Sequence, residues 1–169
     1  MGVNVRQLKT TEWSLWRDLR LRAVRDSPDA FRATLDGELA RQDSDWADII
    51  RATVEHPRGT LLVAEDRNEP IGMLFGRIDA METCAEVGAM WVDPTARGAG
   101  AGGALLDTAI RWAADYGISR LELGVTDGNT AAEALYSSRG LRRTGATDVL
   151  REDSTRTISK WACDIDERL

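Results

Sequence analysis

The residues best suited to bind a ligand are an arginine and a cluster of glycines near the middle of this 169-residue chain. Gly98, Gly100, Gly102 and Gly103 follow Arg97 closely and precede an apolar helical pattern. Glycine lets the backbone come close to a ligand because it has no Cβ atom. The first N–H groups of a helix lack intrahelical partners, and the helix dipole favours negative charge there. A guanidinium adds a forked donor that suits phosphate oxygens. The stretch therefore predicts a phosphate or pyrophosphate site.

Two known phosphate-binding loops fit this stretch less well. Gly98-x-Gly100-x-x-Gly103 matches the G-x-G-x-x-G pattern of dinucleotide-binding folds, and Glu122 lies on the next expected strand. In those folds the glycines follow the strand directly, whereas here residues 93–97, including a proline, intervene. A Walker loop is excluded because no Lys-Ser or Lys-Thr follows the last glycine. A dinucleotide-binding oxidoreductase remains the weaker alternative.

The residues around the glycines complete a longer pattern. Val92-x-Pro94-x-x-Arg97-Gly98-x-Gly100-x-Gly102, followed by Leu105-Leu106, resembles the acyl-coenzyme A signature of the GNAT N-acetyltransferase superfamily. The core pattern of that signature, Arg/Gln-x-x-Gly-x-Gly/Ala, falls on Arg97, Gly100 and Gly102.

A second stretch, further along the chain, strengthens the resemblance. The segment from Ala134 to Leu141 resembles the family's Leu-Tyr-x-x-x-Gly-Phe element, with Leu141 in place of the usual phenylalanine. Asn129 lies where family members commonly contact the pantetheine or diphosphate arm. The resemblance covers residues 61–141 well, and over residues 1–59 it rests on helix order alone.

The resemblance implies a fold and a set of residues that contact the coenzyme. The fold class is α/β of the α+β type: a mixed, mostly antiparallel sheet of six to seven strands with a central splay, flanked by about four helices. We expect one domain over residues 1–169, with acetyl-CoA as the acyl donor. The expected coenzyme contacts are Met90, Trp91, Val92, Arg97, Gly98, Ala99, Gly100, Ala101, Gly102, Gly103 and Asn129.

Acetyl transfer from a thioester to an amine requires a donor to the oxyanion and a proton for the leaving thiolate. Tyr136 is the candidate proton donor, because a phenol can donate a proton and the family uses a tyrosine at this motif position. The resemblance implies that a backbone amide around Trp91 or Val92 stabilises the oxyanion. A covalent carrier is not expected, since Cys84 has no nearby base.

The amine must also lose a proton, and Glu86 is the candidate base, acting directly or through water. Glu122 on the adjoining strand is the alternative, and Glu86 is equally compatible with a solvated carboxylate. On a regular strand Glu86 shares one face with Met90 and Val92, whereas a one-residue bulge would reverse its side chain.

Apolar periodicity predicts the elements that position these residues. In the first half we expect a strand over 4–8, helices over 10–25 and 36–54, and an antiparallel meander of strands over 60–65, 71–78 and 85–92. The meander argues against a dinucleotide fold, which alternates strands and helices from the start. In the second half we expect a helix to about residue 116, a strand over 120–126, a helix over 130–139 capped by Asn129, a strand from residue 141 and a last strand over 155–164.

The first helix carries four arginines and is followed by an aromatic loop residue. We interpret the arginines as a solvated face with an Asp18–Arg22 pair, and a phosphate contact is the alternative. In the GNAT superfamily the first helix pair and its loop form a wall of the acceptor site. By this resemblance Phe31 is a candidate wall residue, and a packed core position is the alternative.

Composition limits the partners. The net charge of −6 argues against a general nucleic-acid binder. No apolar run approaches the length of a membrane span, and no basic-then-apolar leader is present. Two cysteines, Cys84 and Cys163, fit a reduced cytoplasm, and His56 as the sole histidine cannot form a His-based metal site. A homodimer through edge strands is compatible with the family, and Trp161 fits either an exposed dimer contact or the core.

The leading hypothesis is transfer of an acetyl group from acetyl-CoA to a primary amine of a small molecule, by direct attack. A protein N-terminus or lysine is the alternative acceptor. From another class, a non-catalytic coenzyme A-binding sensor is compatible with the same motifs.

Overall fold

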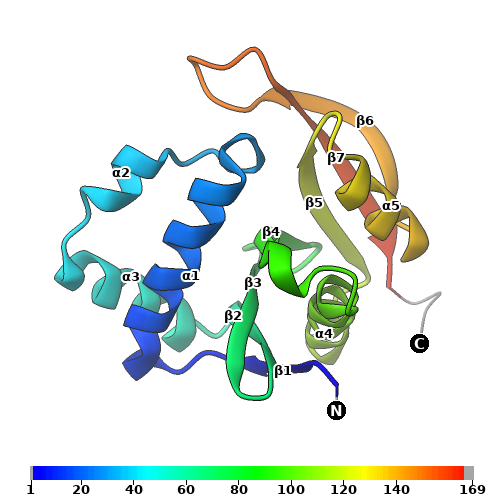
Figure 1. Cartoon of the computed structure of the whole chain (residues 1–169). Coiled ribbons are helices and arrows are strands. Elements are labelled where there is room, and N and C mark those ends of the chain that lie inside the picture. The colour runs from blue at the N-terminus through cyan, green and yellow to red at the C-terminus, as the bar shows by residue number, and fades with distance from the viewer. Residues whose placement is uncertain (1, 166–169) are drawn as a thin grey trace.

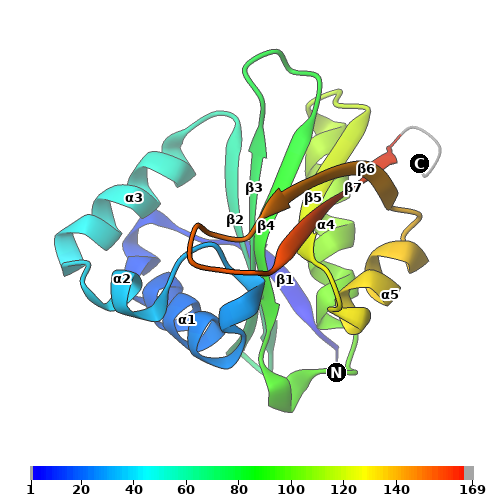
Figure 2. The ribbon, with the colours of Figure 1, turned by 90° about the horizontal axis from the view of Figure 1, so that it is seen from above.

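The computed structural model of the protein describes residues 2–165. One seven-stranded sheet, in the order β1-β2-β3-β4-β5-β7-β6, runs between two layers of helices (Figures 1 and 2). Only the β4–β5 pair is parallel, and all other neighbours are antiparallel. The strands are β1 (Asn4–Gln7), β2 (Gly59–Asp66), β3 (Glu69–Ile78), β4 (Ala85–Val92), β5 (Arg120–Thr126), β6 (Arg142–Val149) and β7 (Thr157–Asp164). The expected mixed, mostly antiparallel sheet is confirmed.

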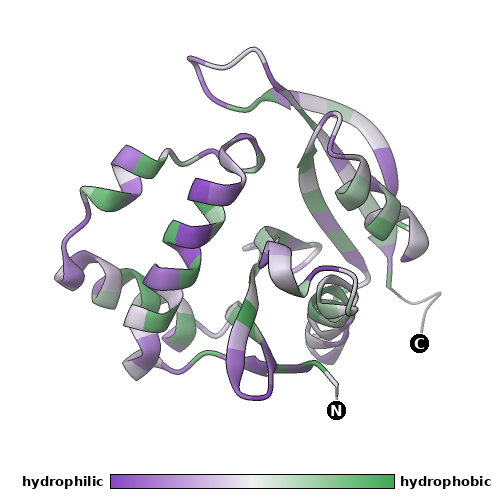
Figure 3. Cartoon of the chain, viewed as in Figure 1, coloured by the Kyte–Doolittle hydropathy of each residue, from purple (hydrophilic) through white to green (hydrophobic). Residues whose placement is uncertain are grey.

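Helices cover both faces of the sheet. One layer holds α1 (Trp13–Asp26), α2 (Leu35–Leu39) and α3 (Asp43–Glu55), and the other holds α4 (Ala101–Asp115) and α5 (Thr130–Ser138) (Figure 2). Short 3-10 turns, η1 (Thr10–Glu12), η2 (Pro28–Ala30) and η3 (Pro94–Ala96), lie in the connections. Apolar and charged residues alternate around α1, so that the helix has a sheet-facing side and a polar side (Figure 3). Two hydrophobic clusters result, one on each face of the sheet.

The sheet parts in its middle. β4 and β5 pair only at Ala85, Glu86 and Val87 with residues 121–123, at one end of the two strands. Beyond that point β5 continues beside β7, while β4 stays beside β3. The ribbons of β4 and β5 diverge accordingly (Figure 1). This parting is the splay that the family resemblance implied.

A β-bulge in β4 lies where the two strands part. Phe75 pairs with Gly88 and Met73 with Trp91, so β4 has one residue more than β3 over this stretch. Ala89 takes up the extra length in a left-handed conformation, with φ of 51°. On a regular strand residues 87 and 91 would share a face, yet Val87 packs in the α4-side cluster and Trp91 in the α1-side cluster.

The single helix expected over residues 36–54 is wrong, because the structure has two helices with a break at residues 40–42. The N–H of Gln42 donates to the Asp45 carboxylate at 2.8 Å, and the N–H of Asp45 donates to the Gln42 carbonyl at 3.0 Å. This reciprocal capping fixes a new helix start. The break lets α2 turn its Glu38 side chain inward, where it is 4% exposed.

Polar contacts hold the two halves of the sheet together across the gap. Asp29 in η2 accepts a hydrogen bond at its carbonyl from the Thr126 hydroxyl at 2.6 Å. Arg151, in the β6–β7 loop, donates to the carbonyl of Phe31 at 2.9 Å. In the opposite direction, Arg32, which follows η2, donates to the Asp148 carboxylate of β6 at 2.8 Å. The η2 loop and the β6–β7 hairpin therefore cover the opening between β4 and β5.

No helix within residues 2–165 combines the length and the apolar character that crossing a membrane requires. Within the same residues, no group of three or more His, Cys, Asp or Glu side chains could hold a metal ion.

The bulge generates a prediction about position 89. We expect Ala89→Val to lower the free energy of unfolding by about 1–3 kcal/mol, because a β-branched residue is strained at positive φ. Ala89→Gly is the matched control and should be at least as stable as the wild type, since glycine adopts this conformation without strain. Urea unfolding measures both variants. Equal stability of the valine and glycine variants would show that the bulge does not depend on residue 89.

Candidate active site

The expected coenzyme residues gather around one cavity of about 500 Å³, called here the turn cavity. The end of β4, the turn between η3 and α4, and the start of α5 form its walls. Of the expected coenzyme contacts, Ala99 is the one that does not line it. Those that do are Met90, Trp91, Val92, Arg97, Gly98, Gly100, Ala101, Gly102, Gly103, Asn129 and Tyr136. Among the described residues no acidic side chain lines this cavity, which suits an anionic ligand.

The start of α4 presents free backbone donors to the turn cavity. Gly100 is the N-cap, with φ of 87°, a conformation that glycine adopts without strain. The first N–H with a partner inside the helix is that of Ala104, which donates to the Gly100 carbonyl at 3.0 Å. The N–H groups of residues 101–103 precede it and have no intrahelical acceptor. Such N–H groups, together with the helix dipole, favour an anionic ligand.

The glycines of the turn differ in what requires them. A Cβ atom on Gly102 would lie 3.0 Å from Leu135, and one on Gly103 would lie 2.2 Å from the Arg139 guanidinium. These two glycines therefore permit close packing of α5 on α4, and sequence reasoning had assigned them to ligand approach alone. Arg139 also binds Asp107 on α4. Its position beside the turn was not predicted.

Arg97 has a protein partner that sequence reasoning missed. Its Nη2 donates to the Asp26 carboxylate at 2.6 Å, and its Nε donates to the Val92 carbonyl at 3.0 Å. Asp26, the last residue of α1, also accepts a hydrogen bond from the Trp91 indole at 2.9 Å. These donors, the indole foremost, hold the pKa of Asp26 below its ordinary value. The ion pair fixes the half-exposed guanidinium at the mouth of the turn cavity.

Tyr136 lies on α5 with its ring buried and its hydroxyl toward β4. The side chain is 7% exposed, and the hydroxyl lies 3.8 Å from the sulfur of Met90. Burial raises the pKa of Tyr136 to about 12, because a phenolate would lose its hydration. Asn129 accepts a hydrogen bond from the Ala132 N–H at 3.3 Å, which confirms its capping role.

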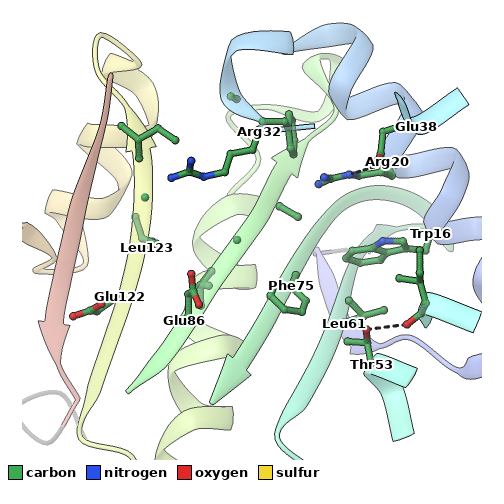
Figure 4. Close-up of a pocket in the computed structure, with 18 of the residues that line it drawn as sticks. Trp16, Arg20, Arg32, Glu38, Thr53, Leu61, Phe75, Glu86, Glu122 and Leu123 are labelled. Atoms are coloured by element: carbon green, nitrogen blue, oxygen red, sulfur yellow. Dashed lines mark hydrogen bonds and ion pairs between the residues drawn. The ribbon is translucent and has the colours of Figure 1, made fainter. Parts of the chain in front are cut away.

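A second cavity, of about 740 Å³, lies on the other face of the sheet between the helices α1–α3 and strands β4, β5 and β7. We call it the wall cavity. Aromatic residues from the helices and from β3 form one side, and charged residues stand at its two ends (Figure 4). Phe31 lines it and is 4% exposed, so the wall and core interpretations both apply to this residue.

Both candidate bases point into the wall cavity. Glu86 and Glu122 are register partners on β4 and β5, one residue before the strands' last pair (Figure 4). Because of the bulge, Glu86 faces away from Met90 and Val92, which pack in the α4-side cluster. Of the two alternatives that the sequence left open, a regular strand and a bulged one, the bulged strand therefore applies.

The two glutamates differ in environment. The Glu86 side chain is 60% exposed and accepts a hydrogen bond from Arg77 at 2.7 Å. Glu122 is 21% exposed and is bound by Arg120 at 3.0 Å and Lys160 at 3.1 Å. Partial burial raises the pKa of Glu122, but these two cations outweigh it, so the pKa lies below its ordinary value.

The two cavities adjoin along β4, where this strand parts from β5. Residues 86–89 of β4 line the wall cavity, residues 90–92 line the turn cavity, and Ala30 in η2 lines both. Ala89 and Met90, the residues at the bulge, have no register partner on β3 or β5 within the described chain. An extended ligand arm could therefore run from the turn cavity along β4 to the wall cavity, beside unpaired strand backbone.

Two further predictions concern Arg22 and Trp161. Arg22 of α1 pairs with Asp93 and not with Asp18, which instead binds Arg17. Arg17, Arg20 and Arg22 of α1 are thus engaged in tertiary contacts. Trp161 is 6% exposed and packs in the α4-side cluster, so the dimer contact considered for it is wrong.

Comparison with known proteins identifies the family. The family model described as "Acetyltransferase (GNAT) family" matches residues 14–141. A mycothiol acetyltransferase of Salinispora tropica is 32% identical over 135 residues, which are 78% of this chain and 41% of that protein. The chain thus spans less than half the length of this curated relative.

Solved structures share the fold. The yncA protein of Salmonella typhimurium, solved with its cofactor acetyl-CoA, has a TM-score of 0.80 and 18% identity, covering 100% of this chain and 97% of its own. A spermidine N-acetyltransferase of Vibrio cholerae, solved with CoA and spermine, has a TM-score of 0.80 and 15% identity, covering 98% and 96%. With its matched motifs and this fold, the chain belongs to the GNAT family of acetyltransferases.

Proposed function

We propose that the protein transfers an acetyl group from acetyl-CoA to a primary amine of a small molecule, by direct attack of the amine on the thioester. The observation that carries this proposal is that the two cavities adjoin along β4, where this strand parts from β5. A donor bound on one face and an acceptor bound on the other would meet there. No covalent carrier is then needed, because the reactants themselves come within attack distance.

The donor would bind through its diphosphate at the start of α4. The N–H groups of residues 101–103 and the Arg97 guanidinium would hold the phosphate oxygens. The fit is supported by the positive charge at the mouth and by the lack of acidic lining among the described residues. The pantetheine arm would then lie along the β4 backbone, and an N–H in the stretch 89–92 would stabilise the oxyanion.

The acceptor amine would attack the acetyl carbonyl from the wall cavity. The attack forms the C–N bond, and the C–S bond then breaks. The proton that the amine loses would pass to Glu86 or Glu122, directly or through water. The more exposed Glu86 is open to solvent for this exchange, whereas Glu122 is already bound by two cations.

Tyr136 would supply the proton that the departing thiolate takes up. With a pKa of about 12, the phenol remains protonated at neutral pH and can donate. The Tyr136 hydroxyl donates to the Met90 sulfur at 3.8 Å. A thioether is a weak acceptor, so the departing thiolate could replace it.

The size of the wall cavity favours a small molecule over a protein tail. Arg32 and Arg151 tie the η2 loop to the β6–β7 hairpin over the gap. A volume of about 740 Å³ is within the usual range for small-molecule sites, about 300–1,000 Å³.

An acceptor screen tests the proposal. The protein is mixed with acetyl-CoA and amino acids, polyamines, aminoglycosides or peptides with a free N-terminus, and thiol release and acetylated product are measured. We expect a small amine with kcat/KM of about 10⁴ M⁻¹s⁻¹ or more. Acetylation of peptides alone would replace the small-molecule acceptor by a protein. Stabilisation by acetyl-CoA without any acetylated product would favour the sensor.

Removal of one hydroxyl tests the proposed proton donor. Tyr136→Phe should lower kcat by about 100-fold, since general acid catalysis contributes about 10²–10⁴-fold, while acetyl-CoA affinity is retained. Because the pKa of Tyr136 is about 12, the ratio of wild-type to variant kcat should be constant between about pH 6 and pH 9. Tyr116→Phe, at the only other tyrosine and 52% exposed, is the matched control. An unchanged kcat in Tyr136→Phe would remove the tyrosine from the mechanism.

A further inference from the structure

A buried carboxylate holds two arginines at the helical side of the wall cavity. Glu38 of α2 is 4% exposed, and its two oxygens accept from Nε of Arg20 at 3.0 Å and Nε of Arg41 at 3.2 Å. Two guanidinium groups against one carboxylate leave one positive charge. All three side chains line the wall cavity. The cluster is therefore a cationic patch inside a partly enclosed site.

Aromatic rings fix both guanidinium groups from a second direction. Arg20 lies over the Phe31 ring, 4.8 Å from its centroid, and Arg41 lies over Trp46 at 5.6 Å. With Nε used by Glu38, each guanidinium keeps its two Nη groups, for which the described part of the chain shows no hydrogen-bond acceptor. The head group of Arg20 points toward the cavity (Figure 4). Such preorganised forks match a carboxylate.

A third arginine near this end, Arg32, already uses both of its Nη groups in contacts with the protein. The guanidinium of Arg32 also points into the cavity (Figure 4), but it donates to Asp148 and to the carbonyls of Val149 and Leu150. Those contacts close the cavity and use its donors.

Two carboxylates stand at the other end. Glu86 and Glu122 lie on the sheet, away from Arg20 and beside the point where β4 and β5 part (Figure 4). Arg77, Arg120 and Lys160 bind them, so this end offers carboxylate acceptors without a net negative charge. A molecule with an acid group at one end and an amine donor at the other would complement both ends.

We propose that the amine acceptor also carries an acid group, a carboxylate above all, which Arg20 and Arg41 bind while the amine points toward Glu86 and Glu122. This inference rests on the proposed acetyl transfer and names the class of acceptor: an amino acid or another amine of that kind. A polyamine would bring a second ammonium group against two guanidinium groups, at a cost.

Matched substrates and variants test this assignment. A panel of amino acids is compared with the corresponding carboxamides, in which the amine is kept and the acid charge is removed, and kcat/KM is measured for each. We expect the best acid to exceed its carboxamide by about tenfold or more, because a hydrogen bond to a charged group contributes that much. Arg20→Gln should bring this ratio close to one through a rise in KM for the acid, with activity on the carboxamide retained.

The control variants keep the test independent of folding. Arg17→Gln removes an arginine of α1 that lies outside the wall cavity, and it should leave the acid-to-carboxamide ratio unchanged. Arg20→Gln, Arg41→Gln and Glu38→Gln combined remove both guanidinium groups without leaving an unpaired buried carboxylate, and this variant should show the same loss of preference. Thermal stabilisation by acetyl-CoA verifies that each variant retains the donor site.

The outcomes separate this inference from the proposed function. Equal kcat/KM for acids and carboxamides in the wild type would overturn the acid-bearing acceptor and leave acetyl transfer to amines standing. A preference that Arg20→Gln does not change would also overturn it. Absence of acetylation of any amine, acid-bearing or not, would contradict both.

Discussion

The parting of β4 from β5 is the constraint on which the rest of this structure depends. β4 remains paired with β3, whereas its pairing with β5 ends after three residues. The bulge at Ala89 absorbs the extra residue and reverses the side chains that follow it. Glu86 therefore faces the wall cavity and Met90 the turn cavity, on opposite faces of one strand. A single irregular strand thereby serves two binding spaces.

The opened sheet needs other contacts to hold its halves together. Parallel pairing ends at Val87, and beyond it the η2 loop and the β6–β7 hairpin bridge the gap through Thr126, Arg151 and Arg32. At the other side, Asp26 connects α1 to the glycine turn. These are side-chain hydrogen bonds and ion pairs, each of which contributes modestly compared with buried apolar surface. The same contacts enclose the proposed acceptor site.

Sequence patterns predicted local features well and long-range ones poorly. Apolar periodicity and the glycine turn predicted nearly every strand and helix. The motifs named Tyr136 and the start of α4 as site residues, and both line one cavity in the structure. The break before α3 had a local signal, the Gln42–Asp45 capping pair, that was outweighed by the apolar pattern. A left-handed alanine has no sequence signature, so the face of Glu86 could not be predicted. The Glu38 cluster joins residues of α1, α2 and the following turn, and only folding brings them together.

The central claim is that the acetyl-bearing arm of the donor lies in the gap between β4 and β5. Amide hydrogen exchange, measured residue by residue by NMR with and without acetyl-CoA, tests it most directly. We expect slower exchange at the N–H groups of Ala89 and Met90 as well as at the start of α4, because a bound arm would shield this unpaired strand backbone. Slower exchange at α4 alone, with Ala89 and Met90 unchanged, would place the arm elsewhere and contradict the central claim.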